Sequence, residues 1–284
     1  MIKTYYQLTK PGIIFGNAIT AIGGYALASK GNINLSLLLI TLIGLSFIIA
    51  SACVCNNYKD QEIDAKMHRT KNRALVKGVI SSKNALIFAS ILMVLGILTL
   101  ALWTNLLTLF MALTGFFLYV VVYSNWKYRS IHGTLIGSLS GGIPPVVGYC
   151  AVQNQLNGGA LLLFSIVALW QMPHFFAIAI YRLQDYVSAS IPVYPAKKGI
   201  PLTKIQMLIY TIAFSLSTIM LTLFHYTGYT YLAVIVPLDL AWLYLCIQGF
   251  KSTNTVKWAR KMFIFSLIII LVLSFMMGID SCRP

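Results

Sequence analysis

The sequence predicts an all-α, polytopic membrane protein with nine transmembrane helices in one bundle. Hydrophobic residues make up 58% of the 284 positions and charged residues only 10%, with a mean hydropathy of +0.81. This composition leaves too few polar side chains to cover a soluble domain. A helix that crosses a hydrocarbon layer of ~30 Å needs ~20 mostly apolar residues. Nine segments meet this requirement, at approximately residues 11–29, 36–57, 84–103, 105–125, 133–153, 159–182, 204–226, 229–250 and 260–280.

The basic residues indicate how these segments are oriented. Lys and Arg concentrate on the cytoplasmic side of membrane proteins. When the nine segments alternate in direction, 19 of the 21 basic residues fall on one side, Lys30 and Arg283 being the exceptions. We therefore expect a multi-pass protein with a cytoplasmic N-terminus and cytoplasmic long loops. The short polar segment before the first span has no small-residue cleavage site and no Arg-rich transit peptide, so we expect a prokaryotic inner membrane. The same bias explains most of the net charge of +15, so no nucleic-acid partner is predicted.

Two connections are long, at about residues 58–83 and 183–203, and each follows an even-numbered segment. Both open with a polar cluster that continues out of the preceding helix. Four helices separate the two loops, which predicts two pseudo-repeated four-helix units with a site at their interface. We expect residues 1–284 to form a single integral-membrane domain whose active site is carried by these two loops.

Three segments carry groups that lipid-facing helices avoid. The fifth contains a run of small residues and a double proline at residues 137–145, which helix packing and cavity lining explain equally well. The sixth holds Gln171 and His174 among aromatic residues, and polar groups at this depth indicate a functional site. Asp239, in the eighth segment, is expected to pair with a neighbouring helix rather than to contact a substrate.

Half of the six carboxylates lie in the polar stretch 56–64, at the end of the second segment. Asn56, Asp60 and Asp64 recur every four residues, so on a helix they drift by only about 40° per step and share one face. Oxygen ligands arranged in this way can hold a hard cation such as Mg²⁺. We predict that these three residues, with Asp185 from the second loop, are the metal ligands and catalytic residues.

Basic residues near these acids predict that the metal-bound ligand is a diphosphate. Arg and Lys neutralise phosphate oxygens that the metal leaves free. For an ordinary loop, simple ion pairing would be the better explanation of such acids. The four-residue register and the second cluster, Tyr181-x-x-x-Asp185, favour the diphosphate site instead. The candidate diphosphate contacts are Arg69, Lys71, Arg73, Lys127, Tyr181 and Arg182.

The stretch Asn56-x-x-x-Asp60-x-x-x-Asp64, followed by Arg69-Thr70-Lys71-Asn72-Arg73, resembles the first signature of the UbiA superfamily of intramembrane prenyltransferases. Tyr181-x-x-x-Asp185 occupies the place of its second motif, although Ala189 stands where a further aspartate is common. Ala74 likewise replaces a frequent proline. The segments 170–175, 191–195 and 132–137 are most similar to the branch of the superfamily that farnesylates heme.

This resemblance implies the reaction and its reagents. Farnesyl diphosphate and heme b would give heme O and diphosphate, with Mg²⁺ assisting ionisation to an allylic cation, and the product would pass to heme-copper oxidase biogenesis proteins. His174, His132 and Trp170 lie in the matching motifs and are the candidate heme contacts. Neutral imidazole is a usual ligand of heme iron, although a lone histidine among aromatics is more often a hydrogen-bonded core residue.

Two other functions stay open from the sequence. A UbiA-type enzyme acting on an aromatic or quinone precursor would share the diphosphate site but not the motif at residues 170–175. A transporter would also suit nine apolar segments, but its binding site should lie near the membrane midplane on broken helices. The acids here lie instead at the cytoplasmic end of a helix.

Overall fold

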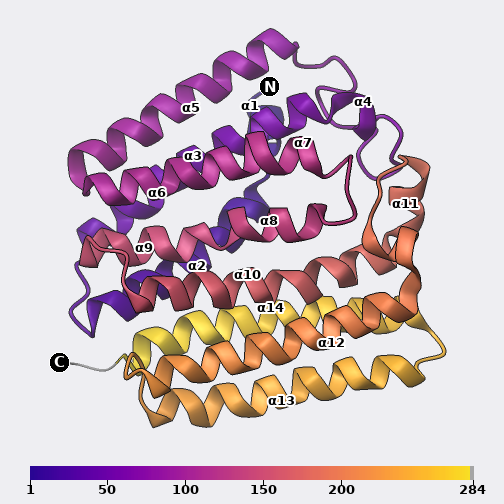
Figure 1. Cartoon of the computed structure of the whole chain (residues 1–284). Coiled ribbons are helices and arrows are strands. Elements are labelled where there is room, and N and C mark those ends of the chain that lie inside the picture. Colours follow the sequence, from indigo (N-terminus) through magenta and orange to yellow (C-terminus); the bar gives the residue numbers. More distant parts are fainter. Residues whose placement is uncertain (282–284) are drawn as a thin grey trace.

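The computed structural model describes residues 1–281, and within them the regular structure is helical apart from an isolated bridge between Thr227 and Ser281. Arg283 lies outside the described residues. The helices run roughly side by side in one bundle (Figure 1). They are α1 (Ile2–Leu8), α2 (Pro11–Ser29), α3 (Leu35–Lys59), α4 (Gln61–Asp64), α5 (Ser82–Trp103), α6 (Leu106–Phe117), the π-helix η1 (Leu118–Tyr123), α7 (Ser124–Trp126), α8 (Gly133–Gly141), α9 (Ile143–Gln153), α10 (Gly158–Tyr181), α11 (Leu183–Ser188), α12 (Tyr194–Leu223), α13 (Tyr229–Lys251) and α14 (Thr255–Ile279).

In the described part of the chain, nine helices are long and apolar enough to cross a membrane, as predicted. The fourth span is built from α6, η1 and α7, and the fifth from α8 and α9. The largest difference from the predicted boundaries is at the seventh span, which begins at Tyr194 rather than near Lys204. Residues 194–198, which were expected in the loop, are helical. They are joined to the span through a kink at Gly199, whose φ is +82°. The second long loop is therefore mostly helical, since α11 also lies within it.

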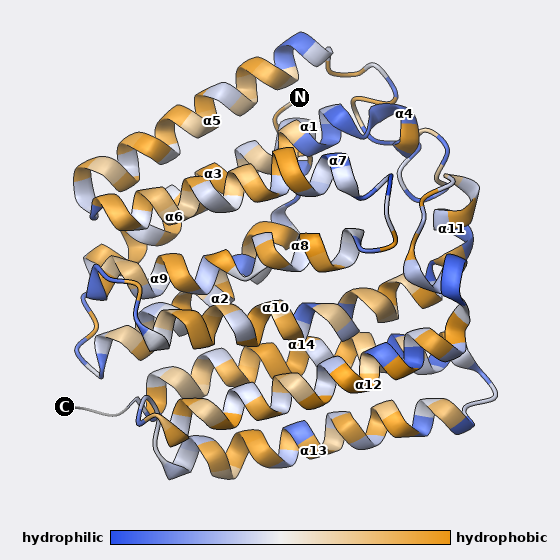
Figure 2. Ribbon diagram, viewed as in Figure 1, coloured by the Kyte–Doolittle hydropathy of each residue, from blue (hydrophilic) through white to orange (hydrophobic). Residues whose placement is uncertain are grey.

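The spans pack as two groups of four on either side of the fifth span. The first four spans pack together around α3, and the last four pack together as α10, α12, α13 and α14. The fifth span contacts both groups through α9 and α8, and α14 packs against α2. Polar residues gather at one end of the bundle, around α4 and α11, while the spans themselves are mostly apolar (Figure 2).

Glycine allows α2 and α9 to pack unusually closely. A Cβ added to Gly24 would lie 2.0 Å from the carbonyl oxygen of Pro145, and one added to Gly148 would lie 2.0 Å from that of Ala21. The small-residue run of the fifth span serves both roles that the sequence left open. Pro145 packs against α2, whereas Gly137, Ser140 and Gly141 line the central cavity described below.

Asp239 pairs with a neighbouring helix, as expected. Its side chain is buried in α13, where the Thr218 hydroxyl of α12 donates to Oδ2 at 2.7 Å. The other carboxyl oxygen, Oδ1, has no hydrogen-bond partner among the described residues. This pair lies outside the cavity, so we assign it to the attachment of α12 to α13.

Replacing Thr218 with valine should therefore destabilise the fold without altering the chemistry. Loss of the hydroxyl leaves a buried carboxyl group without its partner, which costs about 1–3 kcal/mol. We expect a lower thermal midpoint in detergent and unchanged turnover per folded molecule. Thr99→Val is the control, because Thr99 is half-buried and its hydroxyl donates only to the Leu95 carbonyl of its own helix. Equal midpoints for the two variants would contradict the role given to the pair.

Candidate active site

One large cavity, of about 1150 Å³, opens at the polar end of the bundle and continues between the spans. Its mouth is formed by the end of α3, by α4, by the segment after α7 and by the start of α11. Its interior is apolar and is lined by α2, α3, α6, α9, α10 and α14, with residues such as Ile48, Phe116, Val167 and Ile270.

The carboxylates at the mouth keep the four-residue register that the sequence predicts. The amide of Asp60 bonds the carbonyl of Asn56 at 2.9 Å, and the amide of Asp64 bonds the carbonyl of Asp60 at 2.7 Å. The helical path thus continues from α3 through the cap residue Asp60 into α4. Asn56, Asp60 and Asp64 are all buried and all line the cavity.

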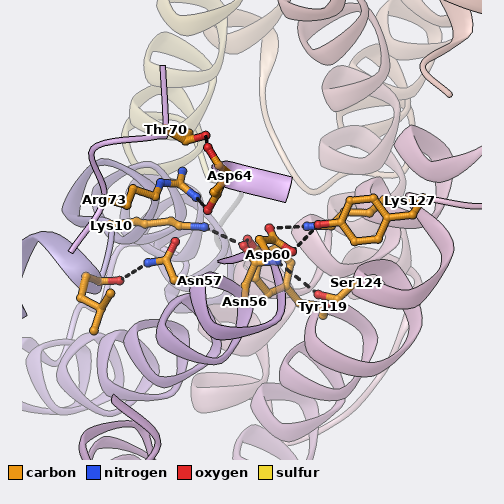
Figure 3. Close-up of polar contacts among 12 residues, drawn as sticks. Lys10, Asn56, Asn57, Asp60, Asp64, Thr70, Arg73, Tyr119, Ser124 and Lys127 are labelled. Atoms are coloured by element: carbon orange, nitrogen blue, oxygen red, sulfur yellow. Dashed lines mark hydrogen bonds and ion pairs between the residues drawn. The ribbon is translucent and has the colours of Figure 1, made fainter. Parts of the chain in front are cut away.

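Each of these carboxylates is paired with a cation (Figure 3). Lys127, just after α7, donates to Asp60 Oδ2 at 2.6 Å, and the Tyr128 hydroxyl donates to Oδ1. Arg73 forms an ion pair with Asp64, and the Thr70 hydroxyl donates to the Asp64 carbonyl at 3.0 Å. Burial lowers the pKa of Lys127, and burial together with the Asp60 charge raises the pKa of Tyr128. The mouth is therefore a partly desolvated network of fixed charges.

Lys10 is a member of this network that the sequence reasoning missed. It precedes α2, and its ammonium donates to Asn56 Oδ1 at 2.6 Å (Figure 3). Asn56 also accepts from the Tyr119 hydroxyl at 3.4 Å and donates to Ser124 Oγ at 3.2 Å. Burial lowers the pKa of Lys10 to about 8, which fits a cation whose immediate partner is a neutral amide. In the sequence Lys10 stands directly before the first span, and the preference of Lys and Arg for the cytoplasmic side was a sufficient explanation of a lysine at that position.

The cavity carries an excess of positive charge. Five cationic side chains line it, against two carboxylates, Asp60 and Asp64, which leaves a formal excess of three. A concave, partly buried surface of this sign concentrates anions. The cations are Lys10, Arg69, Arg73, Lys127 and Arg182.

Ten of the thirteen residues predicted for the site line this cavity, including Tyr181, Arg182, Trp170 and His174. The other three do not. Lys71 and His132 are exposed, and Asp185 is half-buried in α11 with its Oδ2 4.0 Å from Arg182. The second loop nevertheless approaches the first, because the Ser188 hydroxyl oxygen lies 3.5 Å from the carbonyl oxygen of Lys66.

His174 and Trp170 form an aromatic wall of the cavity on α10. Their rings stack with centroids 4.7 Å apart, and Phe263 of α14 packs against the imidazole at 4.9 Å. Both side chains are also hydrogen-bonded to Ser266 of α14, through the Trp170 indole N–H at 2.9 Å and His174 Nδ1 at 2.7 Å. Pro173, inside α10, lies in the same turn.

The donor set at the mouth suits a hard cation, although its arrangement is not a ready-made protein cage. Among the described residues, no three His, Cys, Asp or Glu side chains come together closely enough to hold a metal ion. Mg²⁺ needs only one or two carboxylates when phosphate oxygens and waters supply the remaining ligands. Asp60 and Asp64 provide that number at the mouth of the cavity.

This all-helical membrane bundle, whose cavity has a cation-rich mouth and an apolar interior, fits a class of intramembrane enzyme whose ligand has an anionic head and an apolar tail. Residues 17–268 match the UbiA prenyltransferase family, and the chain belongs to that family. Within the family, its relatives of more than 50% identity are named protoheme IX farnesyltransferase. The enzyme of that name from Protochlamydia amoebophila is 54% identical over 99% of both chains, and that from Cronobacter sakazakii is 52% identical over 100% of this chain and 97% of its own.

Solved structures show the same fold. A digeranylgeranylglyceryl phosphate synthase superposes with a TM-score of 0.79 and 22% identity, covering 98% of both chains. A UbiA homolog from Archaeoglobus fulgidus bound to GPP and Mg²⁺ superposes with a TM-score of 0.65 and 15% identity, covering 97% of this chain and 99% of its own.

Proposed function

We propose that this protein transfers the farnesyl group of farnesyl diphosphate to a vinyl group of heme b, giving heme O and diphosphate. The observation that carries the proposal is that one cavity joins a cation-rich mouth to an apolar interior walled by aromatic residues and an imidazole. Support for heme as the acceptor comes from the names of relatives that are more than half identical to the chain. The whole chain, residues 1–284, acts as one domain.

The chemistry begins at the mouth, where the bond between the farnesyl C1 and the diphosphate oxygen breaks and its electron pair leaves with diphosphate. Lys10, Arg73 and Lys127 are placed to stabilise that developing charge, and low solvent access strengthens their effect. Arg69 and Arg182, at the rim of the cavity, add two further cations. A bound polyanion would compete with Asp64 and Asp60 for Arg73 and Lys127, which form ion pairs with these carboxylates.

Bound Mg²⁺ supplies Lewis-acid stabilisation of the leaving diphosphate. We assign its protein ligands to Asp60 and Asp64, with Asn56 beside them. Asp185 lies outside the cavity and 4.0 Å from Arg182, so it could join them only after a movement of the second loop. If Lys127 and Arg73 bind phosphate oxygens instead, more lone pairs of Asp60 and Asp64 become available to the metal.

The second half of the reaction takes place in the apolar interior. The allylic cation is attacked by the vinyl π bond of heme, and the cation that results on the porphyrin side takes up water and loses a proton. Tyr123, which lies beside Lys127, and Trp170 and Phe175 of α10 line the cavity, and their ring faces can stabilise a passing cation. Apolar walls also exclude bulk water, which would otherwise consume the farnesyl cation.

We assign the protein to a prokaryotic inner membrane, with its N-terminus and the mouth of the cavity on the cytoplasmic side. The uneven distribution of Lys and Arg supports this orientation. Transfer of the product to heme-copper oxidase biogenesis proteins stays a prediction.

A reconstituted assay tests the function directly. Purified protein is incubated with heme b, farnesyl diphosphate and Mg²⁺, with and without EDTA, and the pigments are separated by reversed-phase chromatography. We expect a later-eluting heme of the mass of heme O, and its loss with EDTA. A matched reaction offers 4-hydroxybenzoate in place of heme. Prenylation of the phenol with unaltered heme would overturn the assignment of the acceptor.

The role of Lys10 is tested by Lys10→Gln. Removing a half-buried cation from the mouth should raise the Kd for farnesyl diphosphate by about 10- to 100-fold, because charged hydrogen bonds are worth about 1.5–3 kcal/mol. Isothermal titration with a non-hydrolysable farnesyl diphosphate analogue measures this. Lys3→Gln is the control, since Lys3 is exposed and outside the cavity. Unchanged affinity in Lys10→Gln would remove Lys10 from the diphosphate site.

A further inference from the structure

The hydrogen bonds around His174 define which of its ring nitrogens carries the proton. The Ser266 hydroxyl has one hydrogen, and it donates that hydrogen to the carbonyl of Phe263 at 2.6 Å. The hydrogen bond between Ser266 Oγ and His174 Nδ1, at 2.7 Å, must then be donated by the imidazole. His174 is thereby assigned as the Nδ1–H tautomer, with a free lone pair on Nε2.

Nε2 has no hydrogen-bond partner among the described residues. The atom is not fully buried, because the inaccessible unpartnered side-chain atoms of the described residues do not include it. The side chain lines the central cavity although it is 92% buried, being 8% exposed. Its one unused nitrogen is thus accessible from the cavity rather than enclosed in the core. A core histidine held for packing alone would be expected to have both nitrogens satisfied or enclosed.

Ser266 also fixes the orientation of the ring. It is fully buried on α14, and its carbonyl accepts the indole N–H of Trp170, the residue that stacks on the imidazole. Phe263, one turn earlier on α14, also packs against the ring, with the two centroids 4.9 Å apart. One short segment of α14 therefore holds both the tautomer and the plane of His174.

We propose that His174 binds the iron of the heme substrate through Nε2, an inference that rests on the proposed function. Ser266 is then the positioning residue that makes this nitrogen available. Metal-bound histidines characteristically donate their second ring N–H to a fixed acceptor, which sets the tautomer and increases ligand basicity. Of the four histidines, all of which lie in the described residues, His174 alone lines the cavity. The consequence is that the acceptor is held by its iron, leaving the edge of the porphyrin free to react.

The ligand is tested spectroscopically with purified protein in nanodiscs, without farnesyl diphosphate, so that turnover is not the readout. Ferric and ferrous heme b are titrated into the wild type, His174→Ala and the control His225→Ala, and Soret and magnetic circular dichroism spectra are recorded. His225 is exposed beyond the end of α12 and outside the cavity. We expect a histidine-type spectrum in the wild type and in His225→Ala, its loss in His174→Ala, and its return when imidazole is added to His174→Ala.

Ser266 is tested by resonance Raman of the ferrous complex. Ser266→Ala removes the acceptor for Nδ1–H, so the iron–histidine stretching band should move to lower frequency and heme affinity should fall several-fold. Ser274→Ala is the matched control, because Ser274 is a buried serine two turns further along α14 that packs near Gly23 instead. An unchanged band in Ser266→Ala, or the same shift in both variants, would remove the positioning role.

The outcomes separate this inference from the proposed function. If His174→Ala keeps the wild-type spectrum, or if a thiolate spectrum points to Cys53 in the same cavity, iron ligation by His174 is wrong while heme farnesylation can stand. If no heme binds to the wild type but a prenylated phenol is formed in the reconstituted assay, the proposed function itself fails, and the inference fails with it.

Discussion

Replacing Asp60 with asparagine should lower the rate of farnesyl transfer by about 10²- to 10³-fold, a loss typical of removing one preorganised electrostatic contact from a reacting centre. Asp60 is the carboxylate with the most contacts at the mouth, since both Lys127 and Tyr128 donate to it. The substitution keeps the size of the side chain but removes the charge that a divalent cation requires. Single-turnover measurement of diphosphate release, with heme and Mg²⁺ saturating, measures the effect.

Glu62→Gln is the matched control for Asp60→Asn. Glu62 lies in α4 between the two candidate ligands, but it is exposed and does not line the cavity. We expect its rate to stay near that of the wild type. Heme titration of Asp60→Asn should still give the wild-type spectrum, which shows that the variant is folded. Undiminished turnover in Asp60→Asn would remove Asp60 from the reaction.

The largest effect on stability is expected for Gly148→Leu. The added Cβ would lie 2.0 Å from the carbonyl oxygen of Ala21, and the nearby atoms are backbone, so a rotamer change cannot relieve the clash. Overpacking typically costs 1–3 kcal/mol and more where the backbone must move, so we expect a loss of about 3 kcal/mol. The α2–α9 contact would separate, and with it one wall of the cavity. Thermal unfolding in detergent, followed by tryptophan fluorescence, measures the loss.

Gly16→Ala provides the comparison for that prediction. Gly16 lies on the same helix as Ala21, but no atom lies within 4 Å of an added Cβ. Alanine at this helical position should leave the midpoint unchanged or raise it slightly, because glycine is the poorer helix former by about 0.5–1 kcal/mol. If Gly148→Leu were as stable as Gly16→Ala, the close crossing of α2 and α9 would not be needed for the fold.

The membrane-spanning architecture was predictable because hydropathy acts locally. Each span must satisfy its own backbone hydrogen bonds and present enough apolar residues to cross the hydrocarbon layer. Boundaries read from composition therefore agree with the helices to within a few residues at most ends. The exception at Tyr194 arose where one glycine with positive φ joins two helical pieces, a detail that hydropathy does not register.

The register of Asn56, Asp60 and Asp64 was also local information, since spacing along one helix fixes which face residues share. What the spacing does not contain is the identity of their partners. Lys10 and Lys127 are 46 and 67 residues away from the groups they contact. Only the packing of spans brings these ammonium groups to the end of α3.

The same distinction applies to the histidines. The sequence indicated His174 and His132 together, because both lie in motifs typical of the heme-farnesylating branch. The structure places one on the cavity wall and the other on the exposed surface. Ser266, 92 residues from His174, has no sequence feature that marks it, since its role depends on the contact between α10 and α14.

The sequence by itself thus determined the class of protein, the number of spans and the shared helical face of Asn56, Asp60 and Asp64 at the mouth. These features depend on composition and on periodicity within single helices. Tertiary structure decided which cations meet which carboxylates, how closely α2 and α9 approach, and which nitrogen of His174 is available to a ligand. Those features depend on contacts between helices far apart in the chain, and neither hydropathy nor spacing within one segment carries that information.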